Sequence, residues 1–323
     1  MTGRHIGLCA GLQMMIGAAF GAGSAAAEDL RFFTIGAGDV SGGYFAAATA
    51  ICDVINRQER GRFRCSPEAT QGSLYNIEAL RSGQIDFAIV QSDWQRFAYD
   101  GTVVFEAEGP MTDLRSVMSL YPEDLTVIAR QAAGIIGLEG LRGQRIDIGL
   151  PASGRRGTTL ALLESLGFAL SDFAAVMELP TGAALDALCQ GRLDATIQIS
   201  GHPNAALGRV LRDSAAELVP LDSAMVAQLL AANPDYLPGS IPARDYAALS
   251  APVETFAVTA TLVTRAGMPD DMVQKLVADT LAELPLLKVS APLFREATVA
   301  TMREGGLTAP LHPGAAAAFE AAH

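Results

Sequence analysis

One sequence pattern occurs twice in this chain. Residues 79–92 read A-L-x-x-G-x-I-D-x-x-I-x-x-S, and residues 187–200 repeat the pattern with Leu193 in place of isoleucine. Each copy has the form of a helix end, a glycine turn and an apolar strand that finishes on polar residues. A strand running into a glycine-containing loop precedes each copy, at 33–38 and 146–151. Two similar α/β units with polar loops at their strand ends predict two lobes around a cleft.

The repeat has a simpler interpretation, since a glycine followed by an apolar residue and Asp is a common way to leave a helix and enter a buried strand. The length of 323 residues favours two domains, and the apolar half of the composition suffices for two cores. The net charge of -12 argues against nucleic acid or an anionic membrane surface as a partner. It leaves an anionic small ligand open, because the local field of a pocket can oppose the global charge.

The first residues have the form of an export signal. Arg4 and His5 precede an apolar stretch at 6–20, which is followed by small residues. We therefore expect a cleaved signal peptide at 1–27 and a periplasmic mature protein. The apolar stretch is short and broken by glycine, which favours a signal over a permanent membrane anchor.

Export permits disulfides. Cys52 falls on a predicted helix and Cys65 at the start of the next strand, and such elements pack on each other in an α/β unit. We expect a Cys52–Cys65 disulfide, with free buried thiols as the alternative, and we expect the remaining Cys189 to be buried. No C-x-x-C or H-x-x-x-H spacing occurs, so no metal site is expected.

Strand and helix patterns alternate along the chain, which predicts the α/β class. Expected strands fall at 31–35, 63–68, 87–90, 145–149, near 176 and at 195–199, and expected helices at 44–56, 73–81, 94–99, 158–166 and 183–189. The strand-like runs 114–120 and 125–130, split by Tyr121-Pro122, and the run 255–264 are the candidate crossings between lobes. The expected division is therefore lobe 1 at 28–123 plus 265–323 and lobe 2 at 124–264.

The loop at 36–43 is rich in glycine. It lacks the dinucleotide fingerprint, because Ser41 stands where the third glycine belongs, and it lacks the Lys of a P-loop. A glycine-rich turn at a helix start offers free N–H groups that can hold a carboxylate, and a plain strand-to-helix turn is the alternative. Ser73 suits a helix N-cap, and the two arginines at 155–156 could clamp a carboxylate, with solvated side chains as the alternative.

No pattern indicates catalysis. His202, His312 and His323 lack a motif for a nucleophile–base pair, and no serine lies in G-x-S-x-G. Asp86 and Asp194 follow glycine turns and are expected to bond nearby backbone groups. We expect a binding protein without a cofactor, and a periplasmic hydrolase using Asp86, Asp93 or a cleft serine stays open as the alternative.

Several motifs in order resemble one family of exported proteins. They are T-I-G-x-G-x-x-x-G-x-Y (34–44), R-C-x-x-E-x-T-x-G-S-x-x-N (64–76), G-x-x-D-F-x-x-V-Q-S-D-W-Q (83–95), Y-P-E-x-L (121–125), L-R-G-x-R-x-x-x-G-x-P-x-S-G-x-R-G-T (141–158) and P-L-H-P-G-A (310–315). Together they resemble the TAXI-type solute receptors of tripartite ATP-independent periplasmic (TRAP) transporters, over essentially the whole mature chain.

This resemblance implies a type II periplasmic-binding-protein fold with a hinge and an interlobe ligand cleft. It implies a receptor that delivers a small carboxylate, such as glutamate or 2-oxoglutarate, to a membrane permease driven by a sodium or proton gradient. Nothing in the sequence demands a dimer, so we expect a monomer. An accessory receptor of the same fold for a membrane sensor kinase is an alternative. Arg155 and the residues 149–152 depart from the family's pattern at the ligand loop. The family's ligands are therefore a weaker guide to this chain than the family's role as receptors.

Strand ends and motif positions together give the expected ligand-binding residues. They are Ser41, Gly42, Gly43, Tyr44, Ser73, Asn76, Gln91, Ser92, Asp93, Ser153, Gly154, Arg155, Arg156, Thr158, Ser200 and Gly201.

Overall fold

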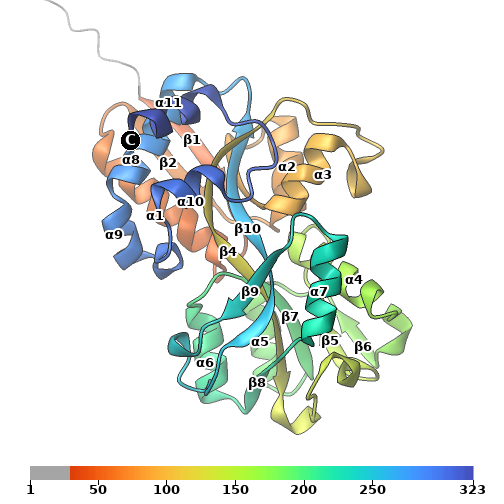
Figure 1. Ribbon diagram of the computed structural model, residues 1–323. Helices are drawn as coiled ribbons and strands as arrows, with labels where there is room; N and C mark the ends of the chain where they lie inside the picture. The colour runs from red at the N-terminus through yellow and green to blue at the C-terminus, as the bar shows by residue number, and fades with distance from the viewer. Residues whose placement is uncertain (1–29, 323) are drawn as a thin grey trace, which may run out of the picture.

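The computed structural model describes residues 30–322, so the expected signal peptide at 1–27 lies outside the described residues. The described chain forms two α/β lobes that share one curled sheet (Figure 1). The strand order along the sheet is β2-β1-β3-β10-β4-β7-β5-β6, with β8 beside β4 and β9 beside β10. None of the helices in this part of the chain combines the length and the apolar character that a membrane span requires.

Lobe 1 begins with a β-α-β-α-β unit whose strands are parallel in the order β2-β1-β3. Its elements are β1 (Arg31–Gly36), α1 (Gly43–Gln58), β2 (Phe63–Glu68), α2 (Ser73–Ser82), β3 (Phe87–Gln91) and the following α3 (Ser92–Asp100). Lobe 2 repeats the unit with β5 (Arg145–Asp147), α4 (Gly154–Ser165), β6 (Ala175–Met177), α5 (Thr181–Cys189) and β7 (Ala195–Ser200). The order β6-β5-β7 mirrors that of lobe 1.

The sequence repeat marks equivalent turns in the two units. Gly83 and Gly191 adopt left-handed φ values of 75° and 70°, which glycine takes without a steric penalty. The aspartate after each turn then accepts a hydrogen bond from the first strand of its unit. Oδ2 of Asp86 accepts from Thr34 N at 2.9 Å, and Oδ2 of Asp194 accepts from Arg145 N at 3.0 Å. The expectation that these aspartates bond backbone groups is confirmed.

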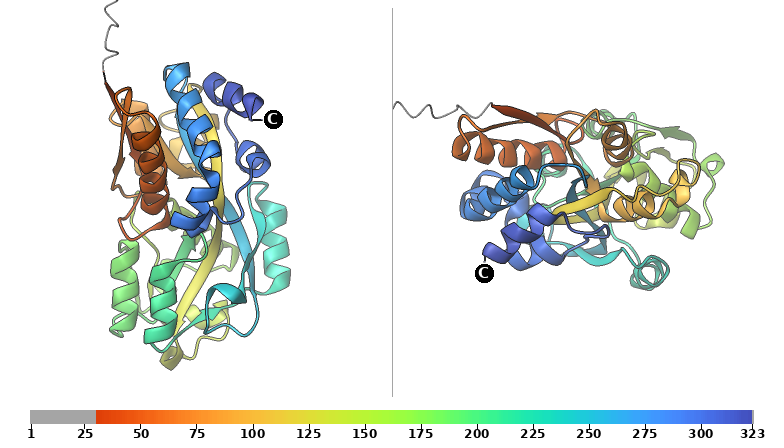
Figure 2. Two further views of the ribbon diagram at one scale, coloured as in Figure 1. Left: turned by 90° about the vertical axis from the view of Figure 1, so that its left-hand side faces the viewer. Right: turned by 90° about the horizontal axis from the view of Figure 1, so that it is seen from above.

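Two long strands, β4 (Leu114–Arg130) and β10 (Val253–Arg265), run side by side from one lobe into the other (Figures 1 and 2). The expected break at Tyr121-Pro122 is wrong, because β4 continues through it. At Pro122 the strand pairs with β10 only, since β7 joins it from Asp124 onward, and a strand with one free side tolerates proline. The second crossing lies inside β10: residues 260–264 pair with β3 of lobe 1, before the expected boundary at 264.

Lobe 2 is completed by elements that the sequence did not predict. They are α6 (Ala205–Asp213), β8 (Ala216–Val219), α7 (Ser223–Ala232) and β9 (Leu237–Ile241). The strand β9 lies within the interval 233–246, whose cluster of Pro, Gly and Tyr residues predicts a long loop instead. It contains Pro238 and Gly239 and pairs with β10 at the edge of the sheet.

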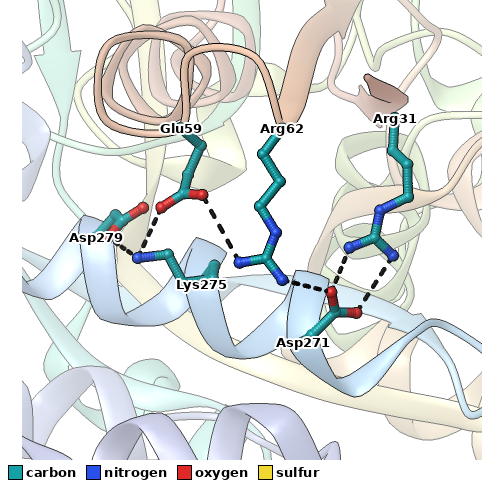
Figure 3. Close-up of polar contacts among 6 residues, drawn as sticks. All are labelled: Arg31, Glu59, Arg62, Asp271, Lys275 and Asp279. Atoms are coloured by element: carbon teal, nitrogen blue, oxygen red, sulfur yellow. Dashed lines mark hydrogen bonds and ion pairs between the residues drawn. The ribbon is translucent and has the colours of Figure 1, made fainter. Parts of the chain in front are cut away.

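The C-terminal helices return to lobe 1, and the first two of them contact α1 (Figure 2). They are α8 (Asp270–Ala282), α9 (Leu284–Ser290), α10 (Val299–Glu304) and α11 (Pro313–Ala321). A network of charged side chains fastens α8 to the first unit (Figure 3). Asp271 pairs with Arg31 and, at 2.9 Å, with Arg62, while Lys275 Nζ lies 2.7 Å from Glu59.

The cysteines differ in their environments. Cys52 of α1 and Cys65 of β2 are joined in a disulfide, as expected. Cys189 is exposed at the last position of α5, so the expectation that it is buried is wrong. In the last turn of that helix Asp186 and Cys189 lie on the exposed side, whereas Ala187 and Leu188 supply the buried side.

Candidate functional site

A cavity lies between the lobes at the carboxyl ends of the parallel strands of both units. Its walls come from the loops after β1, β2, β5 and β6 and from side chains of β3, β4 and β7. It measures about 90 Å³, which gives room for roughly six to nine water-sized groups at the ~10–15 Å³ that one water requires. This size suits a compact solute. The lining residues are Gly38, Asp39, Gly42, Gly43, Tyr44, Gln71, Gly72, Ser73, Gln91, Glu123, Leu150, Ser153, Gly154, Arg155, Leu179, Pro180, Thr181 and Ile199.

Four helices begin at this cavity. Gly42 precedes α1 and Gly72 precedes α2, and neither glycine has a side chain to cap its helix. Ser153 precedes α4, and its Oγ accepts a hydrogen bond from Arg156 N at 3.2 Å. Pro180 precedes α5. The first N–H groups of a helix lack partners within it, and the helix dipole adds partial positive charge at that end. Backbone groups therefore concentrate donors and positive potential on the cavity.

Asn76 holds the walls of lobe 1 together from behind. Its side chain is fully buried, and Nδ2 donates to Ala37 O at 2.7 Å and to Ile89 O at 2.8 Å. Its Oδ1 accepts from Thr70 Oγ1 at 2.7 Å. The amide thus ties together the loop after β1, the strand β3 and the turn before α2. Asn76 was expected to face a ligand, and the structure places it outside the cavity lining as a scaffold residue.

Arg155 lines the cavity with its charge already balanced. Its Nη1 lies 3.0 Å from Oδ2 of the fully buried Asp147, and its Nη2 donates to Leu179 O at 2.6 Å. Burial lowers the pKa of Arg155, and the neighbouring carboxylate of Asp147 opposes that change. The guanidinium group therefore stiffens the wall of lobe 2. Because the charges of Arg155 and Asp147 cancel, the pair adds little net charge to the cavity.

Arg156 and Thr158 lie outside the cavity lining. Arg156 Nε donates to Glu178 Oε1 at 2.6 Å on the outer side of α4. The two arginines thus have separate carboxylate partners, a different geometry from the expected shared clamp. Thr158 Oγ1 accepts a hydrogen bond from Gln91 Nε2 at 3.2 Å, which joins lobe 2 to lobe 1 beside the cavity.

Glu123 on β4 is the principal acid of the cavity. It is 4 % exposed, and Oε2 accepts a hydrogen bond from the hydroxyl of Tyr44 at 2.8 Å. Burial raises the pKa of Glu123 to about 8, and the nearby charges of Asp93 and Asp124 act in the same direction. At neutral pH this carboxyl group is therefore mostly protonated. Residues 30–322 contain no group of three or more His, Cys, Asp or Glu side chains that could hold a metal ion.

Ser92 and Asp93 begin α3 behind the cavity wall. Oγ of Ser92 accepts from Thr259 N at 3.1 Å, which binds the start of the helix to the crossing strand β10. Asp93 is 2 % exposed, and its Oδ1 accepts from Trp94 N at 2.8 Å. Burial raises the pKa of Asp93 to about 7. Both residues were expected to bind ligand, and neither is among the lining residues.

The remaining expected residues are Ser41, Ser200 and Gly201, and they are not among the lining residues. Ser41 bonds to the side chain of Asp39 within the loop after β1. Ser200 ends β7, and the next residue, Gly201, packs against the ring of Tyr121, where a Cβ would lie 2.7 Å from Cδ2. In contrast, the glycines at 42–43 and 154, and Tyr44, Ser73, Gln91, Ser153 and Arg155, line the cavity.

Several lining residues had not been predicted. Glu123 belongs to the Y-P-E pattern, but the expected break of the strand at Tyr121-Pro122 hid its position on a crossing strand. Leu179, Pro180 and Thr181 were missed because α5 begins two residues before the expected start. The frequent placement of proline at helix starts was the available signal for that end of α5.

Two α/β lobes joined by two antiparallel crossing strands, with a cavity at the strand ends between them, define the type II periplasmic-binding-protein fold. The chain belongs to the NMT1-like family, whose model matches residues 35–321.

Solved structures support the fold at low sequence identity. A protein from Bordetella bronchiseptica RB50 aligns at 15 % identity and a TM-score of 0.55, covering 90 % of this chain and 80 % of that one. The ligand-binding component of an ABC-type import system from Staphylococcus aureus, with zinc bound, aligns at 15 % identity and a TM-score of 0.51, covering 90 % and 89 %.

Proposed function

We propose that this chain is a periplasmic solute-binding receptor that encloses a small carboxylate between its lobes and passes it to a membrane transporter. The convergence of four helix starts on one interlobe cavity carries the proposal. Unpaired N–H groups and helix dipoles bind anions without a charged side chain. Glu123 is compatible with an anion, because a carboxyl group with a pKa of about 8 is mostly protonated at neutral pH and can donate a hydrogen bond.

A thermal-shift screen tests this function. The protein is unfolded and refolded to strip any solute carried from the host, then heated with dicarboxylates, keto acids and amino acids. A ligand at a hundred times its dissociation constant stabilises the fold by about 2.7 kcal/mol, which raises Tm by several degrees. The matched control for each acid is its uncharged amide, for example succinamide for succinate. Equal shifts with acid and amide would contradict the anion site, and silence with every solute would contradict the receptor.

We assign the transporter to the TRAP type because of the ordered motifs, among them Q-S-D at 91–93 and P-L-H-P-G at 310–314. An ABC-type importer is the second candidate, since a similar fold occurs in the Staphylococcus aureus import component. The two differ in their energy source. Uptake of the bound solute by the native cell should stop when a protonophore or sodium ionophore collapses the ion gradients. Uptake that survives this treatment and stops on ATP depletion would favour the ABC type.

The arrangement of the acids does not favour the hydrolase alternative. Asp86 precedes β3 and bonds Thr34 N at the end of the sheet opposite the cavity, and Asp93 lies behind the cavity wall. Incubation with a solute that shifts Tm should return that solute unchanged. A product detected by mass spectrometry would revive a catalytic role.

A further inference from the structure

Helix α4 of lobe 2 lies directly on lobe 1. Trp94 Nε1 donates to Gly154 O at 3.1 Å, and Gln91 Nε2 donates to Thr158 Oγ1 at 3.2 Å. Beside them Tyr75 N donates to Ala152 O at 3.1 Å. These bonds join the two lobes next to the cavity, so the structure holds the lobes closed against each other.

Two glycines on α4 allow this approach. A Cβ on Gly157 would lie 2.0 Å from Trp94 Cζ2, and a Cβ on Gly154 would lie 1.9 Å from Gln91 Oε1. Neither glycine has a positive φ, so backbone conformation does not require glycine at either position. Glycine inside a helix is less favourable than alanine. The fit against lobe 1 is the structural reason for glycine here.

Trp94 is a rigid partner for this helix. Its side chain is 4 % exposed and makes edge-to-face contacts with Phe97 at 5.5 Å and Phe105 at 6.3 Å between ring centroids. A ring packed in this way cannot move aside for an added methyl group, whereas the amide of Gln91 can rotate. Trp94 is also the only tryptophan of the chain, so tryptophan fluorescence comes from this ring and from no other.

We propose that Gly157 and Trp94 form a latch between the lobes: the ring of Trp94 seats against α4 only where residue 157 has no side chain, and this seating stabilises the closed state. The latch rests on the proposed function in one respect, that the lobes open and close around a solute. Gly157 does not line the cavity, so it acts as a positioning residue. Apparent affinity scales with the closed fraction, so the latch would tune affinity without touching the solute.

A disulfide trap measures closure without any solute. A Cβ on Gly182 of lobe 2 would lie 3.5 Å from Cβ of Ser41 in lobe 1, within the ~3.5–4.5 Å found in disulfides. Neither residue lines the cavity. The Ser41→Cys/Gly182→Cys pair is placed in a Cys189→Ser background, because the free thiol of Cys189 lies in the same surface pocket as both positions. The rate of cross-linking by oxidised glutathione then reports the closed population.

We expect Gly157→Ala to slow cross-linking about tenfold, since overpacking a buried contact destabilises the state that contains it. Gly137→Ala is the matched control, because a Cβ there meets nothing within 4 Å and its φ of -166° is open to alanine. Circular dichroism and thermal unfolding would be used to check that both variants fold. In the cross-linked parent, Trp94 should be shielded from acrylamide quenching relative to the reduced protein.

A second substitution tests whether the added methyl group acts through the ring of Trp94. Trp94→Phe shortens the ring, so in the Gly157→Ala protein it should recover part of the lost rate. Equal rates for Gly157 and Gly157→Ala, no recovery with Trp94→Phe, or a parent pair that never cross-links would each overturn the latch. A negative thermal-shift screen would contradict the receptor function and leave these rates unaffected, so the two failures are distinguishable.

Discussion

At the scale of single residues, the cavity holds an acid that the fold keeps protonated. The pKa of Glu123 is raised from its ordinary 4.5 to about 8, chiefly by burial. Between these values the unfolded chain has released the proton that the folded chain keeps, so the folded state loses stability as pH rises. At about 1.4 kcal/mol per unit, the loss from pH 6 to pH 8 is on the order of 2–3 kcal/mol.

Glu123→Gln removes this loss, because the amide stays neutral and can still accept the hydrogen bond from Tyr44. We expect the variant to gain stability over the parent as pH rises from 5 to 8, with the difference constant above pH 9. Guanidinium unfolding of the solute-free variant and parent at each pH measures this difference in stability. Glu164→Gln, at an exposed position on α4, is the control and should follow the parent. Parallel curves for Glu123→Gln and the parent would show that Glu123 titrates normally.

At the scale of elements, the disulfide joins the helix α1 to the strand β2 whose loops bound the cavity. The bonded cysteines are 13 residues apart, and closing a loop of that length stabilises the folded state by about 3 kcal/mol. We expect dithiothreitol to lower the guanidinium midpoint accordingly. Cys189→Ser should respond to the reductant as the parent does. The Cys52→Ala/Cys65→Ala protein should unfold at a lower guanidinium concentration than the parent, and dithiothreitol should not change its midpoint. A change of its midpoint with dithiothreitol would point to a different disulfide.

Local pattern was enough to predict the elements of both repeated units. Alternating apolar residues and glycine turns placed β2 and β3 almost to the residue, and the loop ends supplied about half of the cavity lining. The crossing strands required contacts that are distant in the sequence. Pro122 signals a break, and only its one-sided pairing with β10 allows the strand to continue. Glu123 was missed for the same reason, and β9, with Pro238 and Gly239, has a strand conformation only because β10 lies beside it.

At the scale of the whole molecule, ion pairs also connect the lobes. Arg96 Nε of α3 lies 2.7 Å from Oδ2 of Asp235, just before β9. On another part of the interface Arg295 makes two hydrogen bonds to Asp245, whose side chain is 2 % exposed. Pairs of this kind favour the closed arrangement in the same direction as the latch. Unlike a packing contact, they weaken as salt screens the charges.

The rate of cross-linking in the Ser41→Cys/Gly182→Cys protein should therefore fall as sodium chloride rises from low to high concentration. Arg96→Ala should remove part of that dependence and slow the reaction at low salt by less than about fivefold, because a partly exposed pair contributes roughly 0.2–1 kcal/mol. Arg142→Ala is the matched control, since Arg142 pairs with Asp172 inside lobe 2 and should keep the full salt response. If the Arg96→Ala protein keeps the salt response of its parent, the pair with Asp235 makes no contribution to closure, and packing at Trp94 would have to hold the lobes together with the remaining ion pairs.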